Sequence, residues 1–204
     1  MAANPTPKLT PQQYLDLERA AETRHEYFNG QMYAMAGGSA RQSQIIANLA
    51  RELGTLLKRT PCRVMLQDLR VSVSPQGLYA YPDVLVVCEE LKFTDEHQDT
   101  LTNPCLVIEV LSPSTERYDR GLKFAQYRNI SELQEYVLVS QGEPRVEVFR
   151  RQPTGQWLYS DFLGLNLTAV FDSVGCNVAL AEIYDKVTLD KEVFAPKDGA
   201  VDQD

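Results

Sequence analysis

A run of apolar residues with one acid near its centre constrains this sequence more than any other stretch. Residues 105–111 read CLVIEVL, and Glu109 is their only charged or strongly polar member. A run of this length, rich in Val, Ile and Leu, predicts a central strand that is covered on both faces. Burying an unpaired carboxylate is costly in free energy. We therefore expect Glu109 to be paired, neutralised or bound to a cation.

A second apolar run, YPDVLVVC at residues 81–88, contains a single acid, Asp83. Because Pro82 cannot donate a hydrogen bond to a sheet, Asp83 is expected at the mouth of the strand. It either caps a backbone amide in a turn or faces Glu109 from a neighbouring strand. Two such carboxylates repel each other unless a cation lies between them. Oxygen ligands with open positions suit Mg²⁺ or Mn²⁺, with the Val110 carbonyl as a third ligand.

Length and composition predict one domain. The chain has 204 residues, of which 44% are hydrophobic and 24% charged, and this is long enough for a sizeable core. We expect a single domain over residues 9–190, with a flexible N-terminal tail at 1–8 and an acidic flexible tail at 191–204. No apolar run approaches the length of a membrane span, and the first ten residues lack the regions of a signal peptide. These features predict a cytoplasmic protein that does not contact a membrane.

The four cysteines are far apart in the chain and include no CxxC pair. Zinc sites and disulfide frameworks in small proteins are usually recognised by such spacings. The sequence therefore predicts reduced core residues at the positions Cys62, Cys88, Cys105 and Cys176.

The net charge of −8 is unfavourable for nucleic-acid binding, because phosphate contacts supply most of the non-specific affinity. The charge is uneven, however. Residues 41–73 hold six basic and two acidic side chains, whereas residues 89–99 hold five acids and one lysine. This distribution is compatible either with a locally basic face or with a mixed, solvated surface.

Turn and cap signals divide the rest of the chain. Asn29-Gly30 favours a type I′ turn, which predicts a hairpin in which Glu26 lies opposite Tyr33. Thr10 with Gln13, and Ser39 with Gln42, have the spacing of capping boxes at the starts of two helices. In a strand expected at 62–73, the alternation changes phase near Gln67 and predicts a bulge.

The remaining periodicities predict alternating helices and strands. Helices are expected at about 10–21, 39–58, 115–129 and 180–187, and further strands near 135–139, 145–150, 156–162 and 167–171.

Lys123 is a candidate cation for a hydrolytic site. It lies on the helix that follows the Glu109 strand, and that helix is expected to fold back over the sheet. Spacing alone leaves a second interpretation open. Asp119 and Lys123 are four residues apart with the acid first, which is also the favourable order for a surface ion pair worth about 0.2–0.5 kcal/mol.

Four ordered segments give the sequence a family resemblance. RHEYFNGQMYAMAGGS, YPDVLVV, LVIEVLSPST and YDRGLKFAQYRNI together resemble a bacterial family of restriction-endonuclease-like proteins, a branch of the PD-(D/E)xK nuclease superfamily. The similarity runs from about Leu9 to Phe171. The resemblance implies an α/β fold, a restriction-endonuclease-like mixed β-sheet flanked by helices. It also implies Mg²⁺- or Mn²⁺-dependent hydrolysis of phosphodiester bonds.

Carried over by position, the resemblance makes Asp83 and Glu109 the metal-binding acids. The superfamily lysine belongs two residues after Glu109, where this chain has Leu111. Lys123 then resembles a lysine that has migrated to the following helix. Glu26 matches an additional acid of such folds, or it is an ordinary hairpin glutamate. Relatives often carry a histidine where this chain has Gln42.

Three hypotheses follow. The first is a Mg²⁺-dependent endonuclease acting on DNA, with double-stranded DNA as its partner; a homodimer would supply the two sites that cutting a duplex needs. The second is a catalytically inactive binding or regulatory protein that keeps the nuclease fold, motivated by Leu111, Gln42 and the acidic balance. The third is a metal-dependent hydrolase of small phosphate esters.

Overall fold

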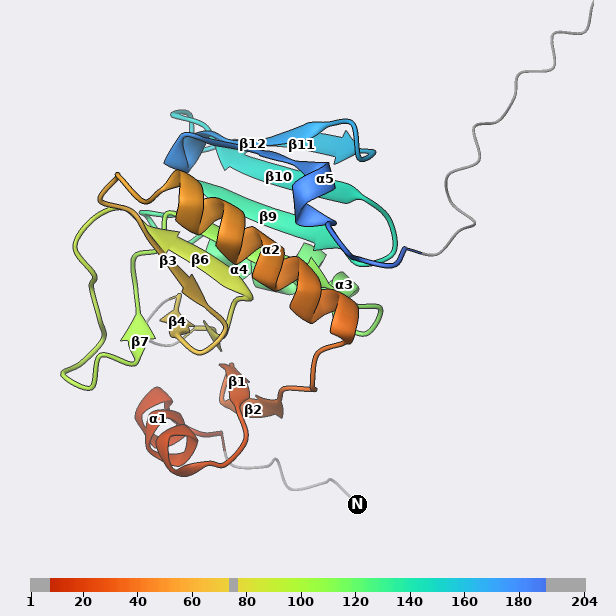
Figure 1. The fold of residues 1–204 in the computed structure, drawn as a ribbon. Coiled ribbons are helices and arrows are strands. Elements are labelled where there is room, and N and C mark those ends of the chain that lie inside the picture. The colour runs from red at the N-terminus through yellow and green to blue at the C-terminus, as the bar shows by residue number, and fades with distance from the viewer. Residues whose placement is uncertain (1–7, 74–76, 190–204) are drawn as a thin grey trace, which may run out of the picture.

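A six-stranded mixed sheet forms the centre of the molecule (Figure 1). The computed structural model describes residues 8–73 and 77–189. Apart from Lys8, both predicted tails lie outside the described residues. The strand order is β11-β10-β9-β8-β6-β3, and a five-stranded sheet, β2-β1-β5-β4-β7, lies beside it. The predicted α/β architecture of a mixed sheet flanked by helices is confirmed.

The described elements form two groups, helices and strands, each in chain order. The helices are α1 (Pro11–Ala20), α2 (Ala40–Leu56), α3 (Glu116–Tyr118), a π-helical turn (Asp119–Lys123), α4 (Phe124–Tyr127), a 3-10 turn (Asp172–Val174) and α5 (Leu180–Ile183). The strands are β1 (His25–Phe28), β2 (Gln31–Ala34), β3 (Arg63–Leu66), β4 (Arg70–Ser72), β5 (Tyr79–Ala80), β6 (Val84–Val87), β7 (Thr100–Leu101), β8 (Leu106–Leu111), β9 (Glu135–Ser140), β10 (Arg145–Arg151), β11 (Trp157–Leu163), β12 (Thr168–Phe171) and β13 (Cys176–Ala179).

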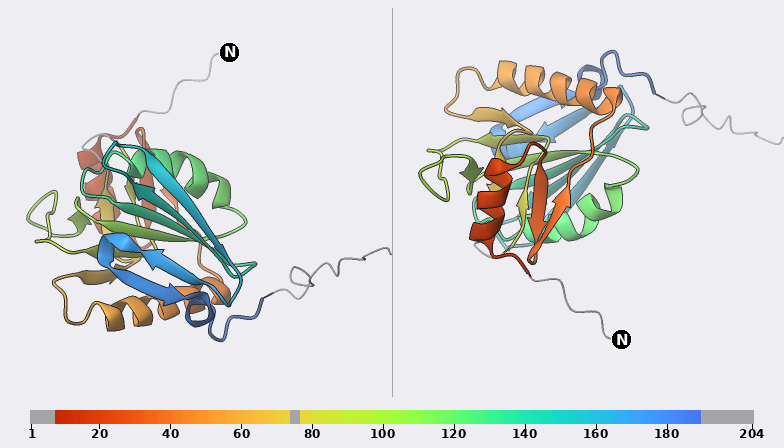
Figure 2. Two further views of the ribbon diagram at one scale, coloured as in Figure 1. Left: turned by 90° about the horizontal axis from the view of Figure 1, so that it is seen from above. Right: turned by 90° about the horizontal axis from the view of Figure 1, so that it is seen from below.

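Two cores cover the two faces of the six-stranded sheet. On one face, α2, α5 and the β12–β13 hairpin pack on alternate residues of the central strands, such as Val84 and Ile108. On the other face, the α3–α4 segment and the five-stranded sheet pack on the residues between them, such as Leu85 and Val107. Figure 2 shows α2 and the blue C-terminal elements on one side of the sheet and the green helix on the other. Burial on both faces explains why β6 and β8 read as continuous apolar runs.

The helix starts follow the predicted caps, with one difference. Thr10 and Gln13 form a complete capping box. Ser39 accepts a hydrogen bond from the Gln42 backbone amide, but the Gln42 side chain does not return it. That side chain is directed to Asp83 instead.

The predicted single strand at 62–73 is wrong in part, because the chain forms two strands there. A turn with a hydrogen bond from the Leu69 amide to the Leu66 carbonyl separates β3 from β4. β3 joins the six-stranded sheet and β4 the five-stranded sheet. The phase change near Gln67 therefore marks a passage between sheets and not a bulge. Three short strands, β5, β7 and β13, were not predicted from the sequence.

Two of the cysteines contradict the prediction of reduced thiols. Cys62 and Cys88 form a disulfide, whereas Cys105 and Cys176 are free. Arg63 pairs with Val87 in the antiparallel β3–β6 register, so the preceding and following cysteines stand opposite each other. Spacing along the chain carries no information about such a cross-strand pair.

A buried glutamate fastens β9 to the segment after β12. The Glu135 carboxylate accepts hydrogen bonds from Arg150 Nε at 2.8 Å, Ser173 Oγ at 2.6 Å and the backbone amides of Asp172 and Ser173 at 3.1 Å each. These donors satisfy a carboxylate that is fully buried. A buried charge is tolerated only with such a set of partners.

Replacing Glu135 with Gln should destabilise the fold. The amide would turn a donor toward groups that are themselves donors, and Arg150 would lose its buried counter-charge. We expect a loss of about 3–5 kcal/mol in the free energy of unfolding, measured by urea denaturation. The matched control is Glu22→Gln at an exposed position, which should change this value by less than about 0.5 kcal/mol.

Among the described residues, no helix has both the length and the hydrophobicity that crossing a membrane requires.

Candidate active site

Asp83 and Glu109 face each other across two central strands. In the antiparallel β6–β8 register Val84 pairs with Ile108, so Asp83, one residue before β6, stands opposite Glu109. The backbone amide of Val110 donates a 2.7 Å hydrogen bond to Asp83 Oδ2. Both side chains are buried, with 8% of Asp83 and 4% of Glu109 exposed. The expectation that the two acids lie on neighbouring strands is confirmed. The predicted role of the Val110 carbonyl as a ligand stays a prediction.

The ammonium group of Lys123 lies among three carboxylates. Lys123 Nζ is 2.9 Å from Glu109 Oε1, 3.0 Å from Glu26 Oε1 and 3.6 Å from Asp119 Oδ1. Only 5% of Lys123 and 3% of Asp119 is exposed. The interpretation of Asp119 and Lys123 as a surface ion pair is therefore wrong. The lysine reaches the centre of the acidic cluster because its helix folds over the sheet.

A π-helical turn presents Lys123 to the sheet. The predicted continuous helix at 115–129 is interrupted, and Asp119 to Lys123 form one π turn between α3 and α4. Such turns occur frequently at functional sites. Tyr136 of β9 donates a hydrogen bond from its hydroxyl to the Asp119 carbonyl at 3.0 Å. This bond ties the turn to the central sheet.

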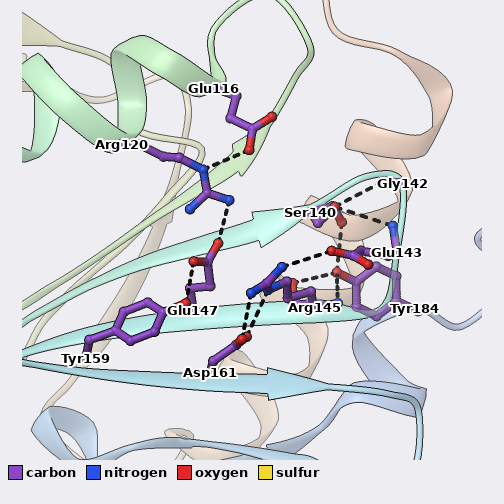
Figure 3. A network of polar contacts seen from close by, with 10 residues as sticks. All are labelled: Glu116, Arg120, Ser140, Gly142, Glu143, Arg145, Glu147, Tyr159, Asp161 and Tyr184. Carbon is purple, nitrogen blue, oxygen red and sulfur yellow. Dashed lines mark hydrogen bonds and ion pairs between the residues drawn. The ribbon is translucent and has the colours of Figure 1, made fainter. Parts of the chain in front are cut away.

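A second anchor holds the same turn to β10. Arg120 Nε lies 2.8 Å from Glu116 Oε1, and its Nη2 lies 2.6 Å from Glu147 Oε2. The hydroxyl of Tyr159 donates to Glu147 Oε1 at 2.7 Å. Figure 3 shows this chain of contacts from the helix to strands β10 and β11. Because Arg120 lies between Asp119 and Lys123 in sequence, these contacts limit the freedom of the turn that positions the lysine.

Glu26 reaches the site from the β1–β2 hairpin. The hairpin has the predicted register, with Glu26 opposite Tyr33, and its turn residues Asn29 and Gly30 have the positive φ angles of 49° and 88° that a type I′ turn requires. β1 pairs with β5 through Tyr27 and Tyr79. The five-stranded sheet therefore carries Glu26 to Lys123, which gives it a place in the cluster. The predicted role of Glu26 as a site acid stays a prediction.

Burial gives the cluster unusual electrostatics. Desolvation raises the pKa of Asp83, Glu109 and Asp119, although the Lys123 ammonium acts in the opposite direction. Burial by itself lowers the pKa of Lys123, but the neighbouring carboxylates, Glu109 first, raise it well above the ordinary value. Three carboxyl groups thus surround one ammonium in a region with little solvent, and Asp83 lies opposite Glu109. An additional cation would relieve this excess of negative charge.

The donor set fits a divalent ion of the Mg²⁺ or Mn²⁺ type. Asp83 and Glu109 supply two carboxylates, and Mg²⁺ typically binds one or two carboxylates and completes its shell with water. Within residues 8–73 and 77–189, no group of three or more His, Cys, Asp or Glu side chains is arranged to hold a metal ion. The two-carboxylate site for Mg²⁺ or Mn²⁺ stays a prediction.

Gln42, where the resemblance places a histidine in relatives, lies beside Asp83 in the structure. Its Nε2 lies 3.2 Å and 3.4 Å from the two oxygens of Asp83. The helix cap at Ser39 places it there, since Gln42 is in the first turn of α2. The sequence predicted Asp119 only as a surface ion-pair partner of Lys123 and not as a member of the buried cluster. The spacing of Asp119, Lys123 and Tyr127, four residues apart, was the available signal that all three face the sheet.

The predicted basic segment is partly neutralised. Arg51 lies close to Glu52, Glu182 and Asp185. Arg70 is buried beside Asp99 and cannot reach a phosphate at the surface. Arg51 and Arg70 are therefore both paired with acids of the protein.

The comparison with known families agrees with this geometry. Residues 11–180 match the model of the Uma2 family, which is described as “Putative restriction endonuclease”. The chain belongs to the Uma2 family. The match covers both central strands, the hairpin with Glu26 and the helix with Lys123, and the predicted family resemblance is confirmed.

Two curated relatives come from Synechocystis sp., and both are named as uncharacterized proteins. One is 38% identical over 182 residues, covering 88% of this chain and 93% of the relative. The other is 37% identical over 171 residues, covering 84% and 97%. Their lengths show that the similarity extends over nearly the whole of each relative.

A solved structure has the same fold. It is the crystal structure of a protein from Anabaena variabilis described as a putative nuclease belonging to DUF820. It superimposes with a TM-score of 0.71 over 86% of this chain and 97% of its own, at 19% sequence identity. At this identity the likeness establishes the fold.

Proposed function

We propose that this Uma2 protein is a Mg²⁺- or Mn²⁺-dependent endonuclease that hydrolyses phosphodiester bonds of double-stranded DNA. The observation that carries the proposal is the buried pair Asp83 and Glu109 on adjacent strands, with Lys123 Nζ 2.9 Å from Glu109. The family description as a restriction endonuclease supports it. Cutting both strands of a duplex further suggests a homodimer.

Each residue of the cluster has a part in this reaction. Asp83 and Glu109 would hold the ion, which when bound supplies a more acidic water and neutralises charge on the phosphate. The Lys123 ammonium would donate to a phosphate oxygen as negative charge develops there. Glu26 holds Lys123 in place, and the Val110 amide holds Asp83. Leu111, at the position of the superfamily lysine, packs in the core instead, so the ammonium must come from the helix.

The test is cleavage of supercoiled plasmid DNA. The purified protein should nick or linearise it with Mg²⁺ or Mn²⁺ and should not do so in EDTA, because removing the ion removes the activated water. Asp83→Ala should lower the rate by at least about a hundredfold. Cleavage that survives EDTA, or that is unaffected by Asp83→Ala, would contradict the proposal.

A second candidate is a nuclease-fold protein that binds without cutting. One observation favours it: the Lys123 ammonium already lies 3.0 Å from Glu26 and 2.9 Å from Glu109, where a bound cation would have to compete with it. Calorimetric titration with Mn²⁺ separates the candidates. Binding that is lost in Glu109→Gln supports the nuclease, and the absence of binding supports the second candidate.

A further inference from the structure

Two buried polar atoms of the acidic cluster have no hydrogen-bond partner among the described residues. They are the hydroxyl of Tyr127 and Oε1 of Glu109. Tyr127 is 0% exposed. Buried polar groups are nearly always hydrogen-bonded, either to protein or to water, and each exception requires an explanation. One of these atoms is a donor and the other an acceptor.

The contact with Lys123 does not complete the hydrogen bonding of Glu109. Lys123 Nζ is 2.9 Å from Glu109 Oε1, which provides a counter-charge, yet the orientation of the two groups does not make a hydrogen bond. Oε1 is therefore neutralised in part but still lacks a donor. Hydrogen bonds from correctly oriented donors are what fix the direction of a carboxylate.

Tyr127 is placed to supply that donor. It follows Lys123 by four residues, so both side chains point from the helix to the sheet. Burial, and next the negative charge of Glu109, raises the pKa of the Tyr127 hydroxyl well above its ordinary value. The hydroxyl therefore keeps its proton at neutral pH and acts as a donor in the electrostatic field of Glu109.

The Tyr127 hydroxyl has no hydrogen-bond partner among the described residues, and its aromatic neighbour Tyr136 does not supply one. The ring of Tyr127 packs against that of Tyr136, with centroids 5.5 Å apart. The Tyr136 hydroxyl is already committed to the Asp119 carbonyl. An apolar side chain would fill this position in the core without an unmet hydrogen bond, so the hydroxyl itself requires a reason.

We propose that Tyr127 is a positioning residue for Glu109, whose carboxylate it orients through one buried water molecule. The water would accept from the Tyr127 hydroxyl and donate to Glu109 Oε1, with Lys123 beside it as a third polar neighbour. Two to four polar partners are what a buried water requires. The consequence for metal binding rests on the proposed function, because it assumes that Glu109 is a ligand.

Tyr127→Phe tests both the water bridge and its consequence for metal binding, since it removes only the hydroxyl. In metal-free protein the melting temperature should fall by about 2–4 °C, because Glu109 and the water lose a partner. In calorimetric titration the Kd for Mn²⁺ should rise by about 10-fold or more, as for the loss of other groups that orient a metal ligand. In cleavage assays kcat should fall and KM for DNA should stay within twofold.

Tyr184→Phe is the matched control. Tyr184 is buried, and its hydroxyl lies 2.8 Å from the Ser140 carbonyl oxygen (Figure 3). Its ring belongs to the core on the opposite face of the sheet from Tyr127. This variant should also lower the melting temperature, but it should leave the Kd for Mn²⁺ and kcat unchanged.

Three results would overturn the proposal. A melting temperature that is unchanged or higher in metal-free Tyr127→Phe would mean that the hydroxyl has no partner to lose. A lower melting temperature with an unchanged Kd for Mn²⁺ would reduce Tyr127 to a structural residue. A crystal structure of metal-free protein without water density between the two atoms would remove the bridge. If wild-type protein fails to bind Mn²⁺, the proposed function and the positioning role both fail, whereas the melting and density results still decide the bridge.

Discussion

Glu109→Gln is expected to abolish Mn²⁺ binding and to lower DNA cleavage by about 10²–10³-fold or more, without unfolding the protein. Glutamine keeps the shape of the side chain and removes its charge. Burial and like charges already raise the pKa of Glu109, so the neutral amide escapes a penalty that the carboxylate carries. Lys123 keeps Glu26 and Asp119 as partners, and its charge stays compensated. The metal-free melting temperature should therefore not fall.

Calorimetry with Mn²⁺, plasmid cleavage and thermal melting measure these three effects. Glu96→Gln is the control, because it makes the same change of charge at an exposed position and should leave all three unchanged. Mn²⁺ binding at wild-type affinity in Glu109→Gln would show that the ion binds elsewhere, and the site as described here would be wrong.

Lys123→Met should have the opposite effects on stability and metal binding from those of Glu109→Gln: it should destabilise the fold and preserve Mn²⁺ binding. It removes the buried ammonium from three carboxylates, and breaking such a buried pair costs about 3–5 kcal/mol in the free energy of unfolding. Mn²⁺ should restore part of this loss and should bind at least as tightly as to wild type, because a competing cation is gone. Cleavage should nevertheless fall by about 10²–10³-fold, since the charge that stabilises the transition state is absent.

Urea denaturation with and without Mn²⁺, followed by cleavage at saturating metal, checks this prediction. Lys92→Met is the control: Lys92 is 54% exposed in its side chain and pairs with Glu132 at the surface, where an ion pair contributes at most about 1 kcal/mol. Cleavage by Lys123→Met at the wild-type rate would show that the ammonium has no role in the reaction and serves only the fold.

Much of the fold, and the pair of buried acids, could be predicted from the pattern of apolar and turn residues along the chain. The apolar runs at β6 and β8 required burial on both faces, and each contained one carboxylate that needed a partner. The Asn29-Gly30 turn fixed the hairpin register in which Glu26 pairs with Tyr33. These inferences held because strand burial and turn geometry depend on neighbouring residues in the chain.

Other features depend on contacts between elements that are distant in sequence. The phase change near Gln67 was compatible with a bulge or with a change of sheet, and only the pairing of β3 with β6 decided it. The same pairing brought Cys62 opposite Cys88. The unpaired, buried hydroxyl of Tyr127 could not be predicted from the sequence either, because a tyrosine at that spacing is ordinary in a core.

The sequence by itself determined that one carboxylate lies within a buried strand and a second at the start of another, and that a lysine follows on the next helix. The tertiary structure alone decided whether that lysine pairs with Asp119 at the surface or with Glu109 inside. Spacing allows both outcomes, since the acid four residues earlier is within reach in any helix. Packing of the helix and the hairpin against the sheet removes water around Lys123, and a desolvated ammonium is held where several carboxylates converge.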